Sequence, residues 1–186
     1  LEERQHDFLW RVHRHAPRLG EFAIFNRSHY EDVLVARVHE LVPKKLWKRR
    51  FDHIADFETL LASHGTLIVK FFLHVSKDVQ KQRFLARLDV PGKEWKFNAA
   101  DVAERARFDD YIGAFEDALT ATSTPWAPWY VIPADHWWLT QALVAWVLVD
   151  KLQSLGLSWP EVSAADHAAN LEARKALEAE PGAGAG

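Results

Sequence analysis

The sequence predicts an α/β fold, a three-layer sandwich in which helices cover a parallel β-sheet. Two observations support this fold class. Short β-prone segments alternate along the chain with longer segments whose apolar residues recur at helical spacing, and strands separated by helices pair in parallel. The chain has 186 residues, of which 48% are hydrophobic and 26% charged, so it can form one globular domain with a sizeable core.

The first elements are a helix and a strand. Residues 3–15 have the pattern of a helix interior, with Phe8, Leu9 and Val12 on one side. No capping signal precedes this helix and the first residue is Leu1, so we expect the natural protein to extend further at its amino terminus. The segment 21–26 follows Gly20 and is β-prone, which predicts the first strand.

Two helices come next. The first covers about residues 28–41, where valines recur at helical spacing, and the second begins after Pro43 and ends at Gly65. The apolar face of the second helix should consist of Trp47, Phe51, Ile54, Phe57 and Leu61.

The central segment 66–75 is rich in β-branched and aromatic residues, which predicts a strand covered on both faces. Ser76 can cap the helix that follows as far as Leu88. A loop at 89–100 then leads to an amphipathic helix at 101–120.

The last part of the chain starts with a third strand at 127–132 and an apolar helix from Asp135 to Leu155. Leu139, Leu143, Trp146 and Val147 should point inward from this helix. We expect one domain over 1–158 and a tail over 159–186, in which 164–179 is helical and 181–186 is flexible.

Composition excludes several classes of function. The net charge of -3 argues against a protein that coats nucleic acid. The absence of cysteine excludes disulfides, thiolate metal sites and thiol catalysis, and it is typical of a reducing compartment. No segment has the length and apolarity of a membrane span. We therefore expect a cytoplasmic protein that binds neither nucleic acid nor membrane.

Residues 24–32, Ile-Phe-Asn-Arg-Ser-His-Tyr-Glu-Asp, carry the strongest functional signal, because an apolar strand end turns into a dense polar cluster where a helix should begin. Ligands of open α/β sheets bind at the carboxyl ends of strands, and helix amino termini there favour phosphate. Arg27, Glu31 and Asp32 should crowd this turn.

Four segments resemble the second family of polyphosphate kinases: 24–32, 70–77, 95–97 and 122–136. They occur in that family's order and spacing, and the resemblance runs from about residue 7 to residue 155. It implies a P-loop kinase fold related to thymidylate kinase, and phosphoryl transfer between inorganic polyphosphate and AMP, ADP or ATP, with guanine nucleotides as further candidates. It also implies Mg²⁺ as the cofactor.

The chain departs from the family pattern in two ways. No Gly-x-x-x-x-Gly-Lys motif occurs in it. The resemblance places that loop upstream of Leu1, so we expect the sheet to lack the P-loop strand and the chain to be inactive alone. The apolar surface left exposed where that strand belongs should make the chain associate, and we expect a homo-oligomer. Secondly, Asn26 to Asp32 stand where much of the family has Asp-Arg-Ser-Trp-Tyr-Asn-Arg, which resembles the branch that uses AMP as well as ADP.

The resemblance and the residue chemistry together suggest roles at the polar turn. Phosphoryl transfer requires metal ions and cations that neutralise charge in the transition state. We expect Asp32 to bind the metal and Glu31 to face the acceptor nucleotide or the metal's water shell. Arg27 should donate two parallel hydrogen bonds to phosphate oxygens. The alternative is that Glu31 and Asp32 only complement the helix dipole.

Cations elsewhere should line a polyphosphate groove. Arg83 and Arg87 share a helix face and resemble lid arginines, with Arg83 in a catalytic role. Lys70 interrupts a buried strand and so needs an anionic partner. In 44–50 five of seven residues are Lys or Arg, which we interpret as a solvated face. The predicted substrate-binding residues are Asn26, Arg37, Lys70, Lys77, Arg87, Lys93 and Lys96.

Two other functions stay open. An ATP-dependent nucleoside monophosphate kinase would have the same fold, although the cations exceed what one triphosphate needs. A polyphosphate-binding protein without catalysis is the other alternative.

Overall fold

A computed structural model describes residues 5–180 of the chain. It contains two compact units, Leu1–Trp146 and Val147–Gly186, whereas the sequence suggested a tail that begins at residue 159. The predicted flexible segment 181–186 and the start of the first predicted helix, at residues 3 and 4, lie outside the described residues.

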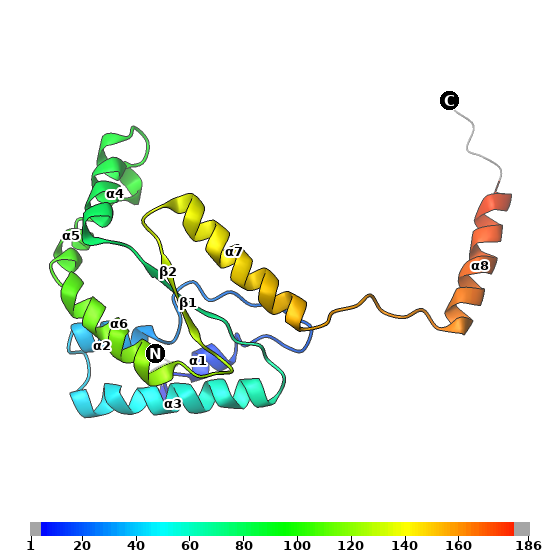
Figure 1. Cartoon of the computed structure of the whole chain (residues 1–186), viewed down its shortest axis with the longest axis horizontal. Coiled ribbons are helices and arrows are strands. Elements are labelled where there is room, and N and C mark those ends of the chain that lie inside the picture. Colours follow the sequence, from blue (N-terminus) through cyan, green and yellow to red (C-terminus); the bar gives the residue numbers. More distant parts are fainter. Residues whose placement is uncertain (1–4, 181–186) are drawn as a thin grey trace. The chain divides into compact units, whose positions relative to one another are not determined.

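The first unit alternates helices with two strands (Figure 1). Its elements are α1 (Trp10–His13), α2 (Glu31–Val38), α3 (Lys44–Ser63), β1 (Lys70–His74), α4 (Lys77–Asp89), the short 3-10 helix η2 (Glu94–Lys96), α5 (Ala100–Arg105), α6 (Phe108–Thr122), β2 (Trp129–Pro133) and the first half of α7 (Trp137–Ser154).

The strands confirm the predicted parallel pairing. β1 and β2 run in parallel, with Lys70 opposite Trp129 and His74 opposite Pro133. They are joined by α4, η2, α5 and α6, as a parallel crossover requires. In the view of Figure 1 the two strands lie between α6 and the first half of α7. The α/β class with a small parallel sheet is therefore correct.

The core of this unit lies where α2 packs against α3 and α6. Val33 and Ile54 are fully buried, and Ala114 and Ala118 on α6 let the helices approach closely. The predicted apolar face of the second helix is also confirmed for Trp47, Ile54 and Phe57, which are buried residues of α3.

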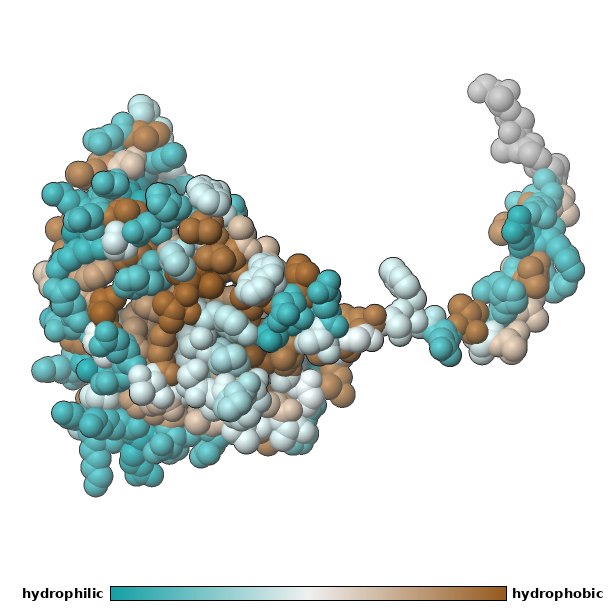
Figure 2. Space-filling view, viewed as in Figure 1, coloured by the Kyte–Doolittle hydropathy of each residue, from teal (hydrophilic) through white to brown (hydrophobic). Residues whose placement is uncertain are grey.

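The first predicted strand is wrong. Residues 21–26 have no regular secondary structure, and Phe22 and Ile24 are 66% and 82% exposed. A strand forms only when a neighbour takes up its N–H and C=O groups. The sheet described here has two strands, β1 and β2, and neither pairs with this segment. Phe22 and Ile24 thus belong to a larger set of exposed hydrophobic side chains, and Figure 2 shows hydrophobic surface interspersed with hydrophilic regions.

Smaller differences concern helix ends and strand ends. The first helix has only four residues in the described part, and the predicted helix at 101–120 breaks into α5 and α6. The strand at 66–75 shortens to β1. Ser76 does cap α4, where its Oγ accepts a hydrogen bond from the Val79 N–H at 3.3 Å. Trp146, expected to point inward, is 69% exposed.

The second unit contains the end of α7 and then α8 (Ala164–Ala179), which matches the predicted helix. Ser163 caps α8 by accepting from the Asp166 N–H at 3.1 Å. No helix within residues 5–180 has the combination of length and apolar side chains that crossing a bilayer demands.

Candidate functional site

A cavity of about 700 Å³ lies in the first unit beside the carboxyl end of β1. Residues from the turn before α2, from α2 itself and from α4, α5 and α6 also line it. This is the edge at which open α/β folds bind ligands. Its polar lining includes Arg27, Glu31, His39, Arg87, Glu104 and Arg105. Its apolar lining includes Leu34, Val35, Phe72, Phe108 and Phe115.

Arg27 lies on this cavity in an unusual backbone conformation. Its φ is 60°, in the left-handed region that residues with a Cβ rarely adopt. Such a conformation costs about 1–3 kcal/mol and persists only where the surrounding structure enforces it. Its guanidinium group is exposed and makes no hydrogen bond or ion pair with residues 5–180. The predicted phosphate-binding arginine is therefore available for a ligand.

Three side chains form a connected group on the cavity wall. The His39 Nε2 atom lies 2.9 Å from Oε2 of Glu104, and the Tyr111 hydroxyl donates to the same oxygen at 2.9 Å. The hydrogen bonds from His39 and then Tyr111 hold the pKa of Glu104 below its usual value. Burial, and then the bond to Glu104, raises the pKa of Tyr111 to about 12. Glu104 is thus held as an oriented carboxylate.

Two further arginines come from the helices that follow β1. Arg105 donates to Oε1 of Gln80 at 2.8 Å and to the Lys77 carbonyl, which ties α5 to the start of α4. Arg87 lies 3.9 Å from Asp101, and both side chains are about 40% exposed. Together with Arg27, these residues give the cavity three guanidinium groups.

Asp32, the predicted metal ligand, is engaged by the protein itself. Arg11 donates to its Oδ2 at 3.0 Å, Arg50 lies 3.5 Å from its Oδ1, and Arg50 also donates to its backbone carbonyl at 2.7 Å. Within residues 5–180 no group of three or more His, Asp or Glu side chains could hold a metal ion.

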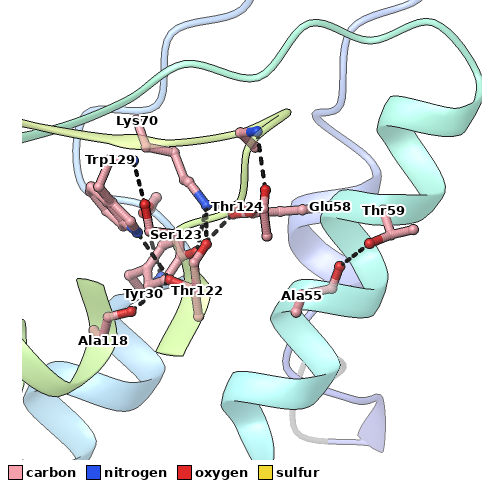
Figure 3. Close-up of polar contacts among 12 residues, drawn as sticks. Tyr30, Ala55, Glu58, Thr59, Lys70, Ala118, Thr122, Ser123, Thr124 and Trp129 are labelled. Carbon is pink, nitrogen blue, oxygen red and sulfur yellow. Dashed lines mark hydrogen bonds and ion pairs between the residues drawn. The ribbon is translucent and has the colours of Figure 1, made fainter. Parts of the chain in front are cut away.

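Lys70 is buried in a polar cluster at the junction of five segments (Figure 3). Its ammonium group donates to Glu58 Oε2 at 2.6 Å and to the Thr122 carbonyl at 2.8 Å, and it lies 3.3 Å from the Tyr30 hydroxyl. The expected anionic partner exists, but it is Glu58 of α3. These contacts give no support to the substrate-binding role predicted for Lys70.

The other predicted residues lie apart from this cavity. Arg83 donates to the carbonyls of Ala134 and Asp135 at 2.7 and 3.1 Å. Arg37 pairs with Asp117 at 2.6 Å and lines a second cavity of about 660 Å³. The remaining four are exposed, and of these Lys77 pairs with Asp109 at 3.0 Å: Asn26, Lys77, Lys93 and Lys96.

The cavity thus contains Arg27, Glu31 and Arg87 of the predicted set, together with residues that the sequence did not suggest. His39 and Glu104 are 65 positions apart. No local spacing could relate them, because His39 follows α2 whereas Glu104 lies in α5, within the crossover from β1 to β2, and only the folded chain brings them together. Glu104 falls in the helix expected at 101–120, where no local motif marks it as a site residue.

Comparison with known proteins identifies the family. Residues 1–156 match the family model "Polyphosphate kinase 2 (PPK2)", so the chain belongs to this family. It is 50% identical to an AMP/ADP-polyphosphate phosphotransferase of Meiothermus ruber, over 92% of this chain and 64% of that protein. It is 46% identical to an ADP-polyphosphate phosphotransferase of Rhodopseudomonas palustris, over 94% of this chain and 65% of that protein.

A solved structure supports the same assignment. The crystal structure of Polyphosphate Kinase 2 from Arthrobacter aurescens TC1 superposes with a TM-score of 0.88 at 46% identity, covering 92% of this chain and 62% of that one. The fold is therefore the α/β fold of the polyphosphate kinase 2 family. The chain spans somewhat less than two thirds of the length of each of these three relatives.

Proposed function

We propose that this member of the polyphosphate kinase 2 family transfers phosphoryl groups between inorganic polyphosphate and the adenine nucleotides AMP and ADP. The observation that carries the proposal is the convergence of Arg27, Arg87 and Arg105 on one cavity at the carboxyl end of β1. The names of the two relatives, one an AMP/ADP and the other an ADP enzyme, support both acceptors.

The arginines would act on the charge of the reacting phosphates. Transfer between two polyanions needs little covalent help from the protein, because positioning and charge neutralisation lower most of the barrier. A guanidinium group offers two parallel N–H donors to phosphate oxygens and stays protonated. Arg27 would hold the transferring phosphate, while Arg87 and Arg105 would hold the neighbouring phosphates of the chain.

The acidic and aromatic lining would serve the nucleoside end of the acceptor. Carboxylates repel phosphates, so Glu31 and Glu104 are expected beside parts of the ligand that donate hydrogen bonds, such as ribose hydroxyls or a base amino group. Phe72, Phe108 and Phe115 supply the apolar surface that a base needs. Guanine nucleotides offer the same kinds of group and are candidates as well.

Kinases of this family generally require a divalent metal ion, and we propose Mg²⁺, which prefers oxygen ligands. Asp32 stays the candidate protein ligand for this ion, because Mg²⁺ is commonly held by one or two carboxylates together with substrate phosphates; its carboxylate also contacts Arg11 and Arg50. We also propose that the protein works in the cytoplasm, where its nucleotide substrates occur, and as a homo-oligomer.

The test is turnover of the full-length protein with polyphosphate and AMP, ADP or GDP in the absence of ATP. We expect nucleoside di- and triphosphates to form. Arg27→Ala should lower kcat/KM on the order of a hundredfold, as expected when a group that stabilises the transition state is removed. Arg174→Ala is the matched control, because Arg174 is exposed on α8 and pairs with Glu178. A parallel reaction with ATP in place of polyphosphate tests the other donor. Transfer from ATP but not from polyphosphate, or full activity of Arg27→Ala, would refute the proposal.

A further inference from the structure

A buried polar cluster contacts the turn that carries Arg27 through two residues of that turn, His29 and Tyr30. Its centre is the ion pair between the carboxylate of Glu58 and the ammonium group of Lys70, two residues that are 2% and 6% exposed. The Tyr30 hydroxyl donates to Glu58 Oε1 at 2.8 Å, while Lys70 donates to Oε2 at 2.6 Å (Figure 3). Both carboxylate oxygens are thus bound, each by a different segment of the chain.

The turn contributes two consecutive side chains to this cluster. Besides Tyr30, His29 points at Glu58, with its Nε2 atom 3.5 Å from Oε1. Both ring nitrogens of His29 are buried without a hydrogen-bond partner in the described part of the chain. The ring of His29 contacts Phe57 edge to face at 5.7 Å. Glu58 and Phe57 of α3 therefore hold the turn in place.

Other elements fix the position of the Tyr30 ring. Its plane meets the Trp129 indole at 75°, with a centroid distance of 4.7 Å. The Trp129 Nε1 atom donates to the Thr122 hydroxyl at 2.9 Å, and the Thr122 carbonyl accepts from Lys70. Strands β1 and β2 and the end of α6 thus hold Tyr30 in one place, and Tyr30 directly precedes α2 as its N-cap residue.

Arg27 needs such an anchor. Its left-handed φ of 60° is unfavourable for a residue with a side chain, and within residues 5–180 the Arg27 side chain makes no hydrogen bond or ion pair that would enforce it. Three residues further along, Tyr30 is 3% exposed and is held by two hydrogen-bonding partners. In the part of the chain that the structure describes, Ser28 accepts hydrogen bonds only from the Tyr30 and Glu31 N–H groups of the same turn. The first side chain after Arg27 that is hydrogen-bonded to other segments of the chain is therefore that of Tyr30.

We propose that Glu58 and Tyr30 are positioning residues for Arg27, because the buried bond between their side chains holds the turn that presents the Arg27 guanidinium group to phosphate in the cavity. This inference rests on the proposed phosphotransferase function. A cluster that only stabilises the fold would lower activity equally whether or not Arg27 is present. A positioning cluster acts through Arg27, so its effect must disappear when Arg27 is altered.

A double-mutant cycle on the full-length protein separates the two roles. Tyr30→Phe removes only the hydroxyl, and Arg27→Lys keeps the charge but removes the planar fork. Tyr130→Phe is the matched control, because the Tyr130 hydroxyl has no hydrogen-bond partner among residues 5–180. Turnover with polyphosphate and ADP is measured for each variant, together with its thermal unfolding midpoint.

We expect Tyr30→Phe to lower kcat about tenfold, with the KM for ADP changed less than about twofold, because the loss is one of alignment. In the Arg27→Lys background the same substitution should change kcat less than about twofold. Glu58→Gln should give the same pattern and replaces Tyr30→Phe if that variant does not fold. Equal losses in both backgrounds, or wild-type turnover of Tyr30→Phe, would overturn the inference.

Failure of the proposed function would be visible separately. If the wild-type protein transfers no phosphate, the proposed function is refuted. The double-mutant cycle is then measured on binding, from the Kd of polyphosphate for the wild type, the two single variants and the double variant. Coupling between Tyr30 and Arg27 in this Kd would still support positioning, whereas independent effects or the absence of polyphosphate binding would contradict it.

Discussion

The Glu58–Lys70 pair gives the sharpest prediction about stability. Lys70→Met removes the ammonium group and leaves the Glu58 carboxylate buried, with the Tyr30 hydroxyl as its remaining hydrogen-bond donor. Removing one partner of a buried ion pair costs about 3–5 kcal/mol, because the other charge stays without compensation. The two side chains are 6% and 3% exposed, so water cannot replace the lost contact. We expect a loss of this size in the free energy of unfolding.

The double variant provides the internal comparison. In Lys70→Met/Glu58→Gln no buried charge is left, and the Tyr30 hydroxyl can still donate to the new side-chain amide oxygen. The Thr122 carbonyl loses its donor, which costs about 1–3 kcal/mol. The double variant should therefore be more stable than Lys70→Met alone, even though it has one more substitution.

Urea unfolding of the full-length protein, followed by tryptophan fluorescence, measures both values, and the m-value checks that unfolding stays two-state. Lys175→Met is the control, since Lys175 pairs with Glu172 on α8 while 69% exposed, and it should leave the midpoint unchanged. A double variant that is less stable than Lys70→Met would show that the buried charges are not what makes the single variant unstable.

The remaining predictions concern pH, Asp32 and the two paired arginines. Burial alone would raise the pKa of Glu58, but its contacts with His29 and Lys70 lower it below the ordinary value of 4.5. The stabilisation from this carboxylate should therefore be present above pH 4.5 and lost as pH falls through the lower folded pKa, and Glu58→Gln should flatten the pH dependence of unfolding in that acidic window. Asp32→Asn should lower the free energy of unfolding by about 1–2 kcal/mol, because Arg11 and Arg50 lose their carboxylate; an unchanged urea midpoint would show that these ion pairs do not stabilise the turn. If Asp32 also binds magnesium, activity should fall about a hundredfold in the same variant, and near-normal turnover of the folded variant would exclude that role. Arg87→Ala should weaken polyphosphate use and reduce the salt slope of binding by about one, whereas Arg83→Ala, which loses contacts to the carbonyls after β2, should mainly lower the unfolding midpoint; equal salt slopes for both variants would contradict this division.

Local patterns predicted much of the helical structure. The apolar spacing in α3 identified its buried face, Ser76 was recognised as the cap of α4, and the boundaries of α8 agree with the prediction. These features depend on residues within one or two turns of each other, and such interactions are readable from the chain itself. The parallel pairing followed from the alternation of elements, because parallel strands need a crossover.

The strand predicted at 21–26 failed for a non-local reason. Its β-propensity is real, but a strand is stabilised by hydrogen bonds to a neighbour, and the two strands described here pair with each other. The same distinction separates Arg83 from Arg87. Their spacing placed them on one helix face, and only the position of the carbonyls after β2 decided that Arg83 bonds to protein while Arg87 lines the cavity.

By itself the sequence determined the family, the fold class and the turn that holds Arg27 and Glu31, because these depend on composition, on local spacing and on short contiguous motifs. The tertiary structure alone decided how each charge is used. The sequence predicted a substrate-binding role for Lys70, as a buried lysine that needs an anionic partner, and a metal-binding role for Asp32. In the structure Lys70 pairs with Glu58 from α3, and Asp32 pairs with Arg11 and Arg50. The energy of a charge depends on its burial and on partners far away in sequence, and these exist only once the chain is folded.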